Sequence, residues 1–219
     1  MDSRPCLQES IANIVSHGIG VVLALVGAPM LVWLAARVGH TETVIACAVY
    51  GFSLVAAFAA STKFHCEHGR PGHRFWLVVD HIAVLLLIAG TVTAMAVVAM
   101  RGEERWYLLG AVWAMAAAGI AFKLIYGLRW EKESMWLYVP LAWGAAMAVP
   151  ALVQKFPGDA LAYLIAGTIT YTLGLLYYAR IGCGRVPYSH AIWHLMVLAG
   201  SAMFYLAVWE FLADAARQA

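Results

Sequence analysis

Long apolar runs separated by short polar segments make up nearly the whole chain. Each of seven runs approaches or exceeds the ~20 residues that a helix needs to cross a bilayer. The runs lie at 18–36, 43–65, 77–100, 106–127, 135–153, 160–180 and 190–212. The pattern therefore predicts an all-α integral membrane protein, with seven transmembrane helices that form a single domain over residues 1–219.

The composition supports a membrane location and excludes one class of partner. Hydrophobic residues make up 63% of the 219 residues and charged residues only 12%, far from the balance of a soluble domain. The net charge is +2, from 14 basic and 12 acidic side chains, without a basic stripe, so we expect no nucleic-acid partner. The N-terminus lacks the pattern of a cleaved signal peptide. We therefore expect a multi-pass protein of the cell (inner) membrane with an uncleaved first span.

The distribution of Lys and Arg predicts which way the chain faces. With seven spans, the N-terminus and the loops after spans two, four and six share one side, and the other loops share the opposite side with the C-terminus. The first side carries nine basic residues: Arg4, Lys63, Arg70, Arg74, Lys123, Arg129, Lys132, Arg180 and Arg185. The second carries five: Arg37, Arg101, Arg105, Lys155 and Arg217. Since basic loops stay in the cytoplasm, the N-terminus is expected there and the C-terminus outside.

Polar and ionisable residues within the spans collect at the ends expected to face the cytoplasm. A charged group at membrane depth costs on the order of 2.5 to 3.5 kcal/mol, so the placement of such groups is informative. Spans two, three and seven contribute Ser61 and His65, Asp80 and His81, and His190 and His194. Glu9, Asn13 and His17, spaced by four, approach span one from the same side. We predict one polar site on the cytoplasmic side that does not cross the membrane.

The spacing of the histidines favours a zinc site. His190 and His194 are four residues apart, so they share one helix face, and Ser61 and His65 have the same spacing. Three imidazoles and an open position are typical of catalytic zinc, whereas structural zinc usually has four protein ligands. Asp80 is then the natural carboxylate to hold the bound water.

Simpler interpretations stay open for several of these residues. Ser61 can bond to a carbonyl of its own helix, and Asp80 can cap its helix or pair with Arg74. His81 points about 100° away from Asp80 and suits packing or a neighbouring role. His17 suits a hydrogen-bonded neighbour of the site better than a ligand.

Four glycines are candidates for close helix packing. Gly20, Gly27, Gly167 and Gly174 lie within apolar runs. Small residues allow helix backbones to approach closely in a membrane.

Four segments together resemble the hemolysin III proteins, the bacterial branch of the progestin and adipoQ receptor group. They are "ESIANIVSHGIG" at 9–20, "STKFH" at 61–65, "DHIAVLLLIAGT" at 80–91 and "HAIWHLMVLAGS" at 190–201. The resemblance implies seven helices around a zinc ion held by three histidines, which map onto His65, His190 and His194. It also implies that Asp80 reaches the metal through water beside Ser61. Glu9, Asn13 and His17 belong to the first segment and would surround the site.

Three functions are compatible with this pattern. The first is zinc-dependent hydrolysis of an amide or ester bond in a membrane lipid, with Asp80 as proton acceptor and Ser61 steadying the oxyanion; the constellation resembles that of the alkaline ceramidases. The second is a lipid receptor or membrane-homeostasis sensor in which zinc is structural. The third is a cytolytic pore, as the family name suggests, although the outer halves of the spans offer little polar lining. In the first two cases the partner is a membrane lipid, as substrate or ligand.

Overall fold

The computed structural model describes residues 7–129, 152–181 and 186–218, and within these ranges the regular structure is helical. The helices are α1 (Leu7–Val38), α2 (Thr41–Cys66), α3 (His73–Ala99), α4 (Glu103–Tyr126), α8 (Gly158–Ile181) and α9 (Ser189–Gln218). Each of these six is long and apolar enough to cross a membrane. The prediction of an all-α membrane protein is thus confirmed for the described ranges. The span expected at 135–153 lies almost entirely outside them.

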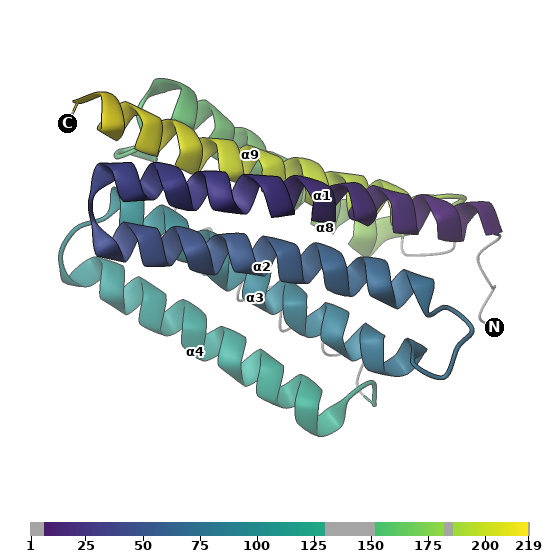
Figure 1. The fold of residues 1–219 in the computed structure, drawn as a ribbon. Coiled ribbons are helices and arrows are strands. Elements are labelled where there is room, and N and C mark those ends of the chain that lie inside the picture. The colour runs from purple at the N-terminus through teal and green to yellow at the C-terminus, as the bar shows by residue number, and fades with distance from the viewer. Residues whose placement is uncertain (1–6, 130–151, 182–185, 219) are drawn as a thin grey trace.

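The helices form a bundle in which sequence neighbours pack side by side (Figure 1). Short connections join α1, α2, α3 and α4 in antiparallel order, and α9 returns beside α1 with α8 along its other flank (Figure 1). Gly39, at φ +85°, makes the tight turn between α1 and α2 that suits a residue without a side chain. As a result, the beginnings of α1, α3 and α9 meet the end of α2 at one end of the bundle.

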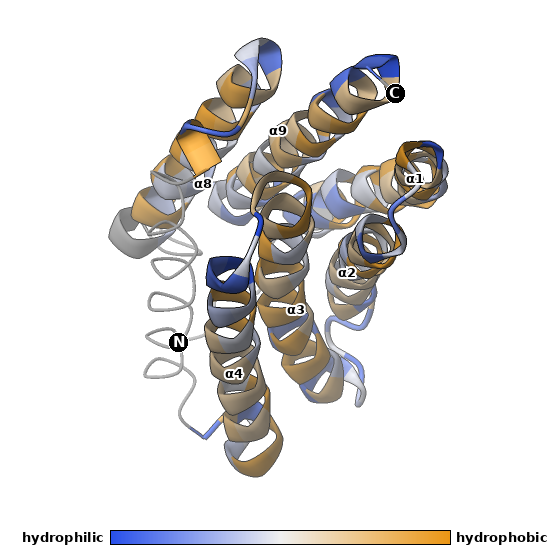
Figure 2. Ribbon diagram, turned by 90° about the vertical axis from the view of Figure 1, so that its left-hand side faces the viewer, coloured by the Kyte–Doolittle hydropathy of each residue, from blue (hydrophilic) through white to orange (hydrophobic). Residues whose placement is uncertain are grey.

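Helix α3 lies at the centre of the bundle and α1 at its surface. In its most apolar stretch, 78% of the α3 residues are buried, compared with 28% for α1. Large apolar side chains such as Val22, Val26 and Trp33 point outward from α1, as expected for a lipid-facing helix. In a view along the bundle, hydrophobic residues lie on the outward-facing as well as the inward-facing sides of the helices (Figure 2).

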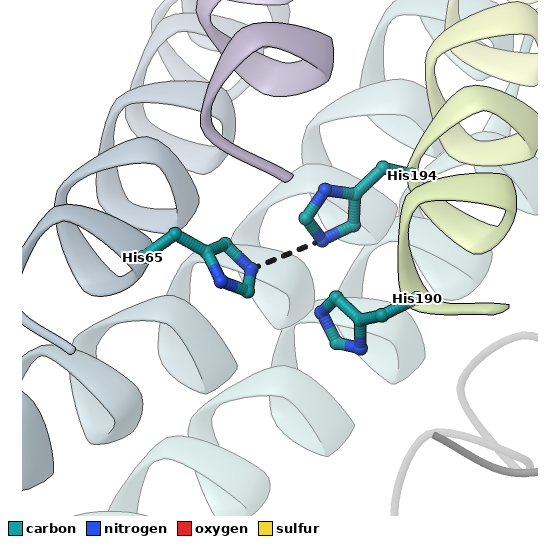
Figure 3. A group of neighbouring side chains, drawn as sticks. All are labelled: His65, His190 and His194. Atoms are coloured by element: carbon teal, nitrogen blue, oxygen red, sulfur yellow. Dashed lines mark hydrogen bonds between the residues drawn. The ribbon is translucent and has the colours of Figure 1, made fainter. Parts of the chain in front are cut away.

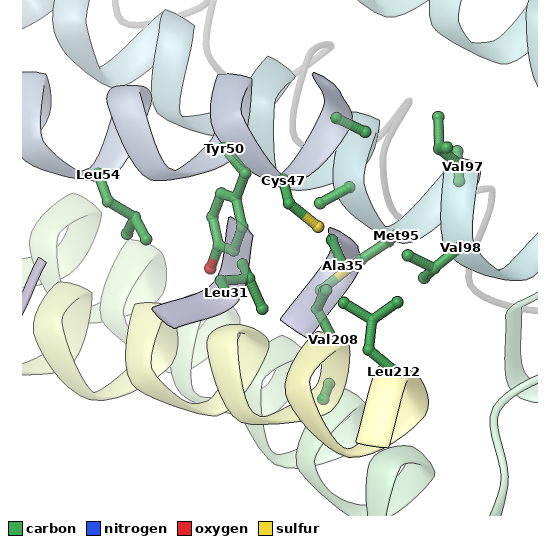
Figure 4. Close-up of a cluster of buried hydrophobic side chains, with 14 of the residues drawn as sticks. Leu31, Ala35, Cys47, Tyr50, Leu54, Met95, Val97, Val98, Val208 and Leu212 are labelled. Atoms are coloured by element: carbon green, nitrogen blue, oxygen red, sulfur yellow. The ribbon is translucent and has the colours of Figure 1, made fainter. Parts of the chain in front are cut away.

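The core is built mainly by α1, α2, α3 and α9. Figure 4 shows side chains of these helices in contact, including Leu31, Tyr50, Met95 and Val208. Because lipid tails are as apolar as these side chains, close packing holds such helices together more than burial does. The helix interfaces therefore depend on shape.

The four predicted glycines lie at such close contacts. A Cβ on Gly20 would meet the Phe58 ring at 2.6 Å, and one on Gly27 would meet Tyr205 at 3.2 Å. On α8, Gly167 contacts Phe204 and Gly174 contacts Trp193 and Met196. The prediction of close helix approach is confirmed at all four positions. Gly20 matters most for the site, because Phe58 lies edge-on against His17.

Helix α1 begins much earlier than the apolar run that predicted it. The run starts at residue 18, whereas the helix starts at Leu7. The intervening polar residues Glu9, Asn13 and His17 lie on one helical face, and Asn13 and His17 are buried against the rest of the bundle. A hydropathy boundary misses this extension because the face is polar.

Candidate metal centre

Three histidines meet where α2 ends and α9 begins. His65 lies in the last turn of α2, and His190 and His194 lie in the first two turns of α9. Their rings point toward one another across the gap between the two helices (Figure 3). One ligand nitrogen from each ring lies within 4.8 Å of the other two. The structure therefore brings together the three residues that spacing alone suggested.

The separation of His65 and His194 suits a shared metal ion, and the widest separation in the group, up to 4.8 Å, would have to shorten when an ion binds. The Nε2 atoms of His65 and His194 are 3.2 Å apart. Two nitrogens bound at about 2.0–2.1 Å to one tetrahedral zinc ion would be about 3.3 Å apart. His194 is 2% exposed, whereas His65 and His190 are only partly buried. The donor set is thus anchored by one deeply buried ring and remains accessible beside the other two.

Helix α1 supports His194 from the side away from His65. The Nδ1 atom of His194 lies 3.1 Å from Ser16 Oγ and 3.3 Å from the Asn13 carbonyl oxygen. The His17 ring stacks on the His194 ring, with centroids 3.7 Å apart and an angle of 17° between the planes. Hydrogen bonds to the second ring nitrogen are typical of metal-binding histidines.

The His17 ring is buried without a hydrogen-bond partner for either nitrogen among the described residues. It is 6% exposed and packs between His194 and Phe58. This agrees with the expectation that it neighbours the site, although the contact is stacking instead of a hydrogen bond.

Glu9 ties the start of α1 to the chain that enters α9. The Tyr188 N–H donates to Glu9 Oε1 at 2.9 Å, and the Tyr188 hydroxyl donates to Gln8 Oε1 at 3.2 Å. Tyr188 has a φ of +59°, a left-handed conformation that a residue with a side chain rarely adopts. These two bonds hold the turn that aims His190 and His194 into the bundle.

Ser61 and Asp80 lie together between α2 and α3. Ser61 is 3% exposed, and its side chain interacts with the Asp80 carboxylate. The ion pairs of the described residues do not join Asp80 to Arg74, and their side-chain hydrogen bonds do not join Ser61 to its own helix. Ser61 is one turn from His65, so the pair adjoins the histidines on α2.

His81 belongs to a different contact. Its Nδ1 atom lies 2.9 Å from the Lys123 ammonium nitrogen of α4, and Lys123 is only 1% exposed. The sequence left two roles open for His81, packing or a place beside the site. Its position favours packing in the α3–α4 interface.

Two residues near the site were not anticipated from the sequence. Ser16 contacts His194, and Lys123 contacts His81. Ser16 follows Asn13 by three residues, so the polar face defined by Glu9, Asn13 and His17 could have revealed it. Lys123 is a cation within the predicted span 106–127 and was itself a signal, although its partner His81 could not be read from spacing along one helix.

The opposite end of the bundle holds a charged pair. Arg105 of α4 donates to Glu42 Oε2 of α2 at 2.7 Å, and the Arg105 side chain is 8% exposed. Nearby, His40, Thr43, Arg101 and Phe211 help to line a cavity of about 250 Å³. This end therefore pairs a buried cation with an anion, while the Arg105 Nε–H has no partner among the described residues.

Comparison with known proteins gives a consistent result over the length of the chain. A family model described as haemolysin-III related matches residues 6–205. The chain is 35% identical to Hemolysin-3 of Bacillus cereus over 202 residues, 92% of this chain and 91% of that protein. It is 27% identical to the monocyte to macrophage differentiation factor of Homo sapiens over 214 residues, 95% of this chain and 87% of that protein. It is 24% identical to an ADIPOR-like receptor of Eremothecium gossypii over 181 residues, 72% of this chain and 57% of that protein.

Proposed function

Since the chain belongs to the haemolysin-III-related family, with relatives of the progestin and adipoQ receptor type, we propose that it is a zinc-dependent hydrolase of a membrane lipid. The ion would be held by His65, His190 and His194 on the cytoplasmic side. The observation that carries the proposal is the convergence of three imidazole nitrogens within 4.8 Å.

The donor set favours zinc in a reactive role. It consists of three imidazoles without a thiolate among the described residues, which is typical of catalytic sites that keep one position open. When bound by three imidazoles, zinc supplies an acidified water and a Lewis acid for a carbonyl oxygen. Partial exposure of His65 and His190 leaves a side from which a substrate can approach.

Asp80 and Ser61 have the chemistry that hydrolysis requires. Asp80 accepts a proton from the water that attacks the carbonyl carbon, and returns it to the leaving amine or alcohol as the C–N or C–O bond breaks. A fatty acid and an amine or alcohol result. Ser61, which lies against Asp80, orients the carboxylate and can turn its hydroxyl toward the developing oxyanion.

The position of the site suggests the substrate class. The three histidines lie at the ends of helices long enough to cross a membrane, so we expect them at the depth where the bilayer passes from acyl chain to headgroup. The amide and ester bonds of membrane lipids lie at this boundary. A lipid with its acyl chain along the bundle can therefore bring its carbonyl to the histidines.

A receptor or sensor with structural zinc is the second candidate. The name of the ADIPOR-like relative favours it. In this case the lipid binds and is released unchanged, so Asp80→Asn alters neither zinc content nor lipid binding.

A cytolytic pore, suggested by the name Hemolysin-3, has less support from the fold. Among the described residues, hydrophobic side chains of α1, α2, α3 and α9 pack against one another beyond the histidines (Figure 4). The tyrosines there are already engaged: Tyr171 bonds to the Ser201 hydroxyl at 2.6 Å, and Tyr50 donates to the Ser201 carbonyl at 3.3 Å. They do not line an open polar path.

The first test is the zinc content of the purified protein, measured by elemental mass spectrometry. We expect about one zinc ion per chain in the wild type, and loss of the ion in His65→Ala, His190→Ala and His194→Ala. His68→Ala is the matched control, because this exposed loop histidine lies three residues beyond His65. A folded wild type without metal would refute the zinc proposal.

The second test is turnover in vesicles that contain either a ceramide or a diacyl phospholipid. Zinc-loaded wild type should release fatty acid from one of them, and Asp80→Asn should not, although its zinc content is unchanged. Lipid binding without release by the wild type would favour the sensor.

A further inference from the structure

Two hydrogen-bond acceptors on α1 determine where the ring proton of His194 lies. Ser16 Oγ is 3.0 Å from the Asn13 carbonyl oxygen and 3.1 Å from His194 Nδ1. A carbonyl oxygen can only accept, so the single hydroxyl proton of Ser16 is used in the bond to Asn13. With its proton in that bond, the Ser16 oxygen acts as an acceptor toward His194.

The contact with the Asn13 carbonyl leads to the same conclusion independently. His194 Nδ1 lies 3.3 Å from that oxygen, which would face a lone pair if Nδ1 were unprotonated. With a proton on Nδ1, the N–H points to the Ser16 oxygen and, less closely, to the Asn13 oxygen. Both contacts are then favourable at once.

The proton on Nδ1 fixes the state of the other ring nitrogen. A neutral imidazole carries one N–H, so Nε2 of His194 keeps its lone pair. This atom is the one that lies 3.2 Å from His65 Nε2, inside the group of three histidines. Ser16 thus prepares His194 to bind a cation through Nε2.

Burial makes this choice of proton position strong. Ser16, Asn13 and His194 are 6%, 6% and 2% exposed, so water does not offer an alternative acceptor to Nδ1. The stack with His17 prevents the His194 ring from moving away from the acceptors. An unmatched N–H here would be a buried polar group without a partner, which is costly.

We infer that Ser16 is a positioning residue of the metal centre, which holds His194 in the Nδ1–H tautomer and aims its Nε2 lone pair at the ion. The inference rests on the proposed function for its consequence, metal affinity. Its structural part, the tautomer, can be tested without any metal.

The test combines metal affinity with a spectroscopic reading of the tautomer. Zinc affinity is measured by competition with a fluorescent chelator for wild type, Ser16→Ala and Ser53→Ala. Ser53 is the matched control: it is also buried and donates to a carbonyl three residues back, Tyr50, at 2.7 Å. The protein is also labelled with ¹⁵N-histidine, and the His194 signals are identified by their loss in His194→Ala.

We expect zinc affinity to fall about 10-fold or more in Ser16→Ala, as for other partners of metal-binding histidines, and to be unchanged in Ser53→Ala. In metal-free wild type, the Nδ1 of His194 should give the signal of a protonated nitrogen. Equal affinities for the two variants, or a proton on Nε2, would overturn the inference and leave the proposed function intact. A wild type that binds no zinc would refute the proposed function. The tautomer of His194 would then still test the inference. If Ser16→Ala does not fold, a proton on Nε2 of His194 in the wild type would still overturn the inference.

Discussion

The two ends of the bundle handle buried polar groups in opposite ways. At one end, Arg105 and Glu42 form an ion pair at 2.7 Å, so charge is neutralised within the protein. At the other end, three histidines direct nitrogens at one another, with His65 and His194 Nε2 3.2 Å apart. Nitrogen lone pairs attract a cation, and the group of ligand atoms itself consists of three imidazoles. The first end pairs its charges within the protein, whereas the second offers nitrogen ligands to the ion that we propose.

The largest effect is expected from Asp80→Asn. The amide keeps the size of the carboxylate and a partner for Ser61, but it cannot accept a proton. Loss of a general base typically slows a reaction by about 10²–10⁴-fold. We expect turnover of the lipid substrate to fall by this amount while zinc content and melting temperature stay near wild type. Full turnover in this variant would mean that the carboxylate only supports the fold, as the ion pair does at the other end.

Metal removal tests whether the histidine end needs an ion for stability. At a free zinc concentration about 100 times the dissociation constant, binding stabilises the folded state by about 2.7 kcal/mol. A strong chelator should therefore lower the melting temperature of the wild type in detergent. His194→Ala should melt at a lower temperature than zinc-loaded wild type and should not respond to chelator. An equal response in both proteins would place the metal elsewhere.

The histidine end could be predicted from the sequence where the signal is local, whereas the pair of Arg105 and Glu42 was not predicted. Apolar runs predicted the described helices, and the four-residue spacing of His190 and His194 predicted a shared face. The convergence of His65 on that face also followed, because both segments lie at helix ends on the same side of the membrane. These inferences need only helix geometry and the length of a span.

The contacts that were not predicted are those set by packing between distant segments. The Ser16–His194 contact joins positions 178 residues apart, and the ring of His81 turns toward Lys123 on α4. The early start of α1 was missed for a related reason: its polar face becomes buried only when α9 packs against it. Hydropathy and spacing describe one helix at a time, so they do not report which neighbour covers a face.

Glu42→Gln should affect only the charged end. It removes the charge opposite Arg105, which is 8% exposed, whereas Glu42 itself is largely exposed. Solvent at Glu42 weakens the pair, so we expect a loss of stability of about 1 kcal/mol. Chemical denaturation or thermal melting in detergent measures this loss. Zinc affinity should be unchanged, and a decrease would show that the two ends are coupled through α2.

The smallest effect is expected at the exposed pair that borders the histidine end. Lys63 Nζ lies 2.6 Å from Glu67 Oε1, and this hydrogen bond holds the pKa of the Glu67 carboxyl below its usual 4.5. A lowered pKa means that the folded state favours the charged form, so the stabilisation is present above pH 4.5 and is lost as pH falls through the lower folded-state value. Hydrogen exchange in the 67–72 loop, corrected for its intrinsic pH dependence, should therefore speed up slightly in that range. Glu67→Gln should remove this step, because the amide has no proton to gain. If Glu67→Gln shows the same pH step, the step comes from the neighbouring histidines. The pair of Lys63 and Glu67 would then contribute nothing to the stability of the loop.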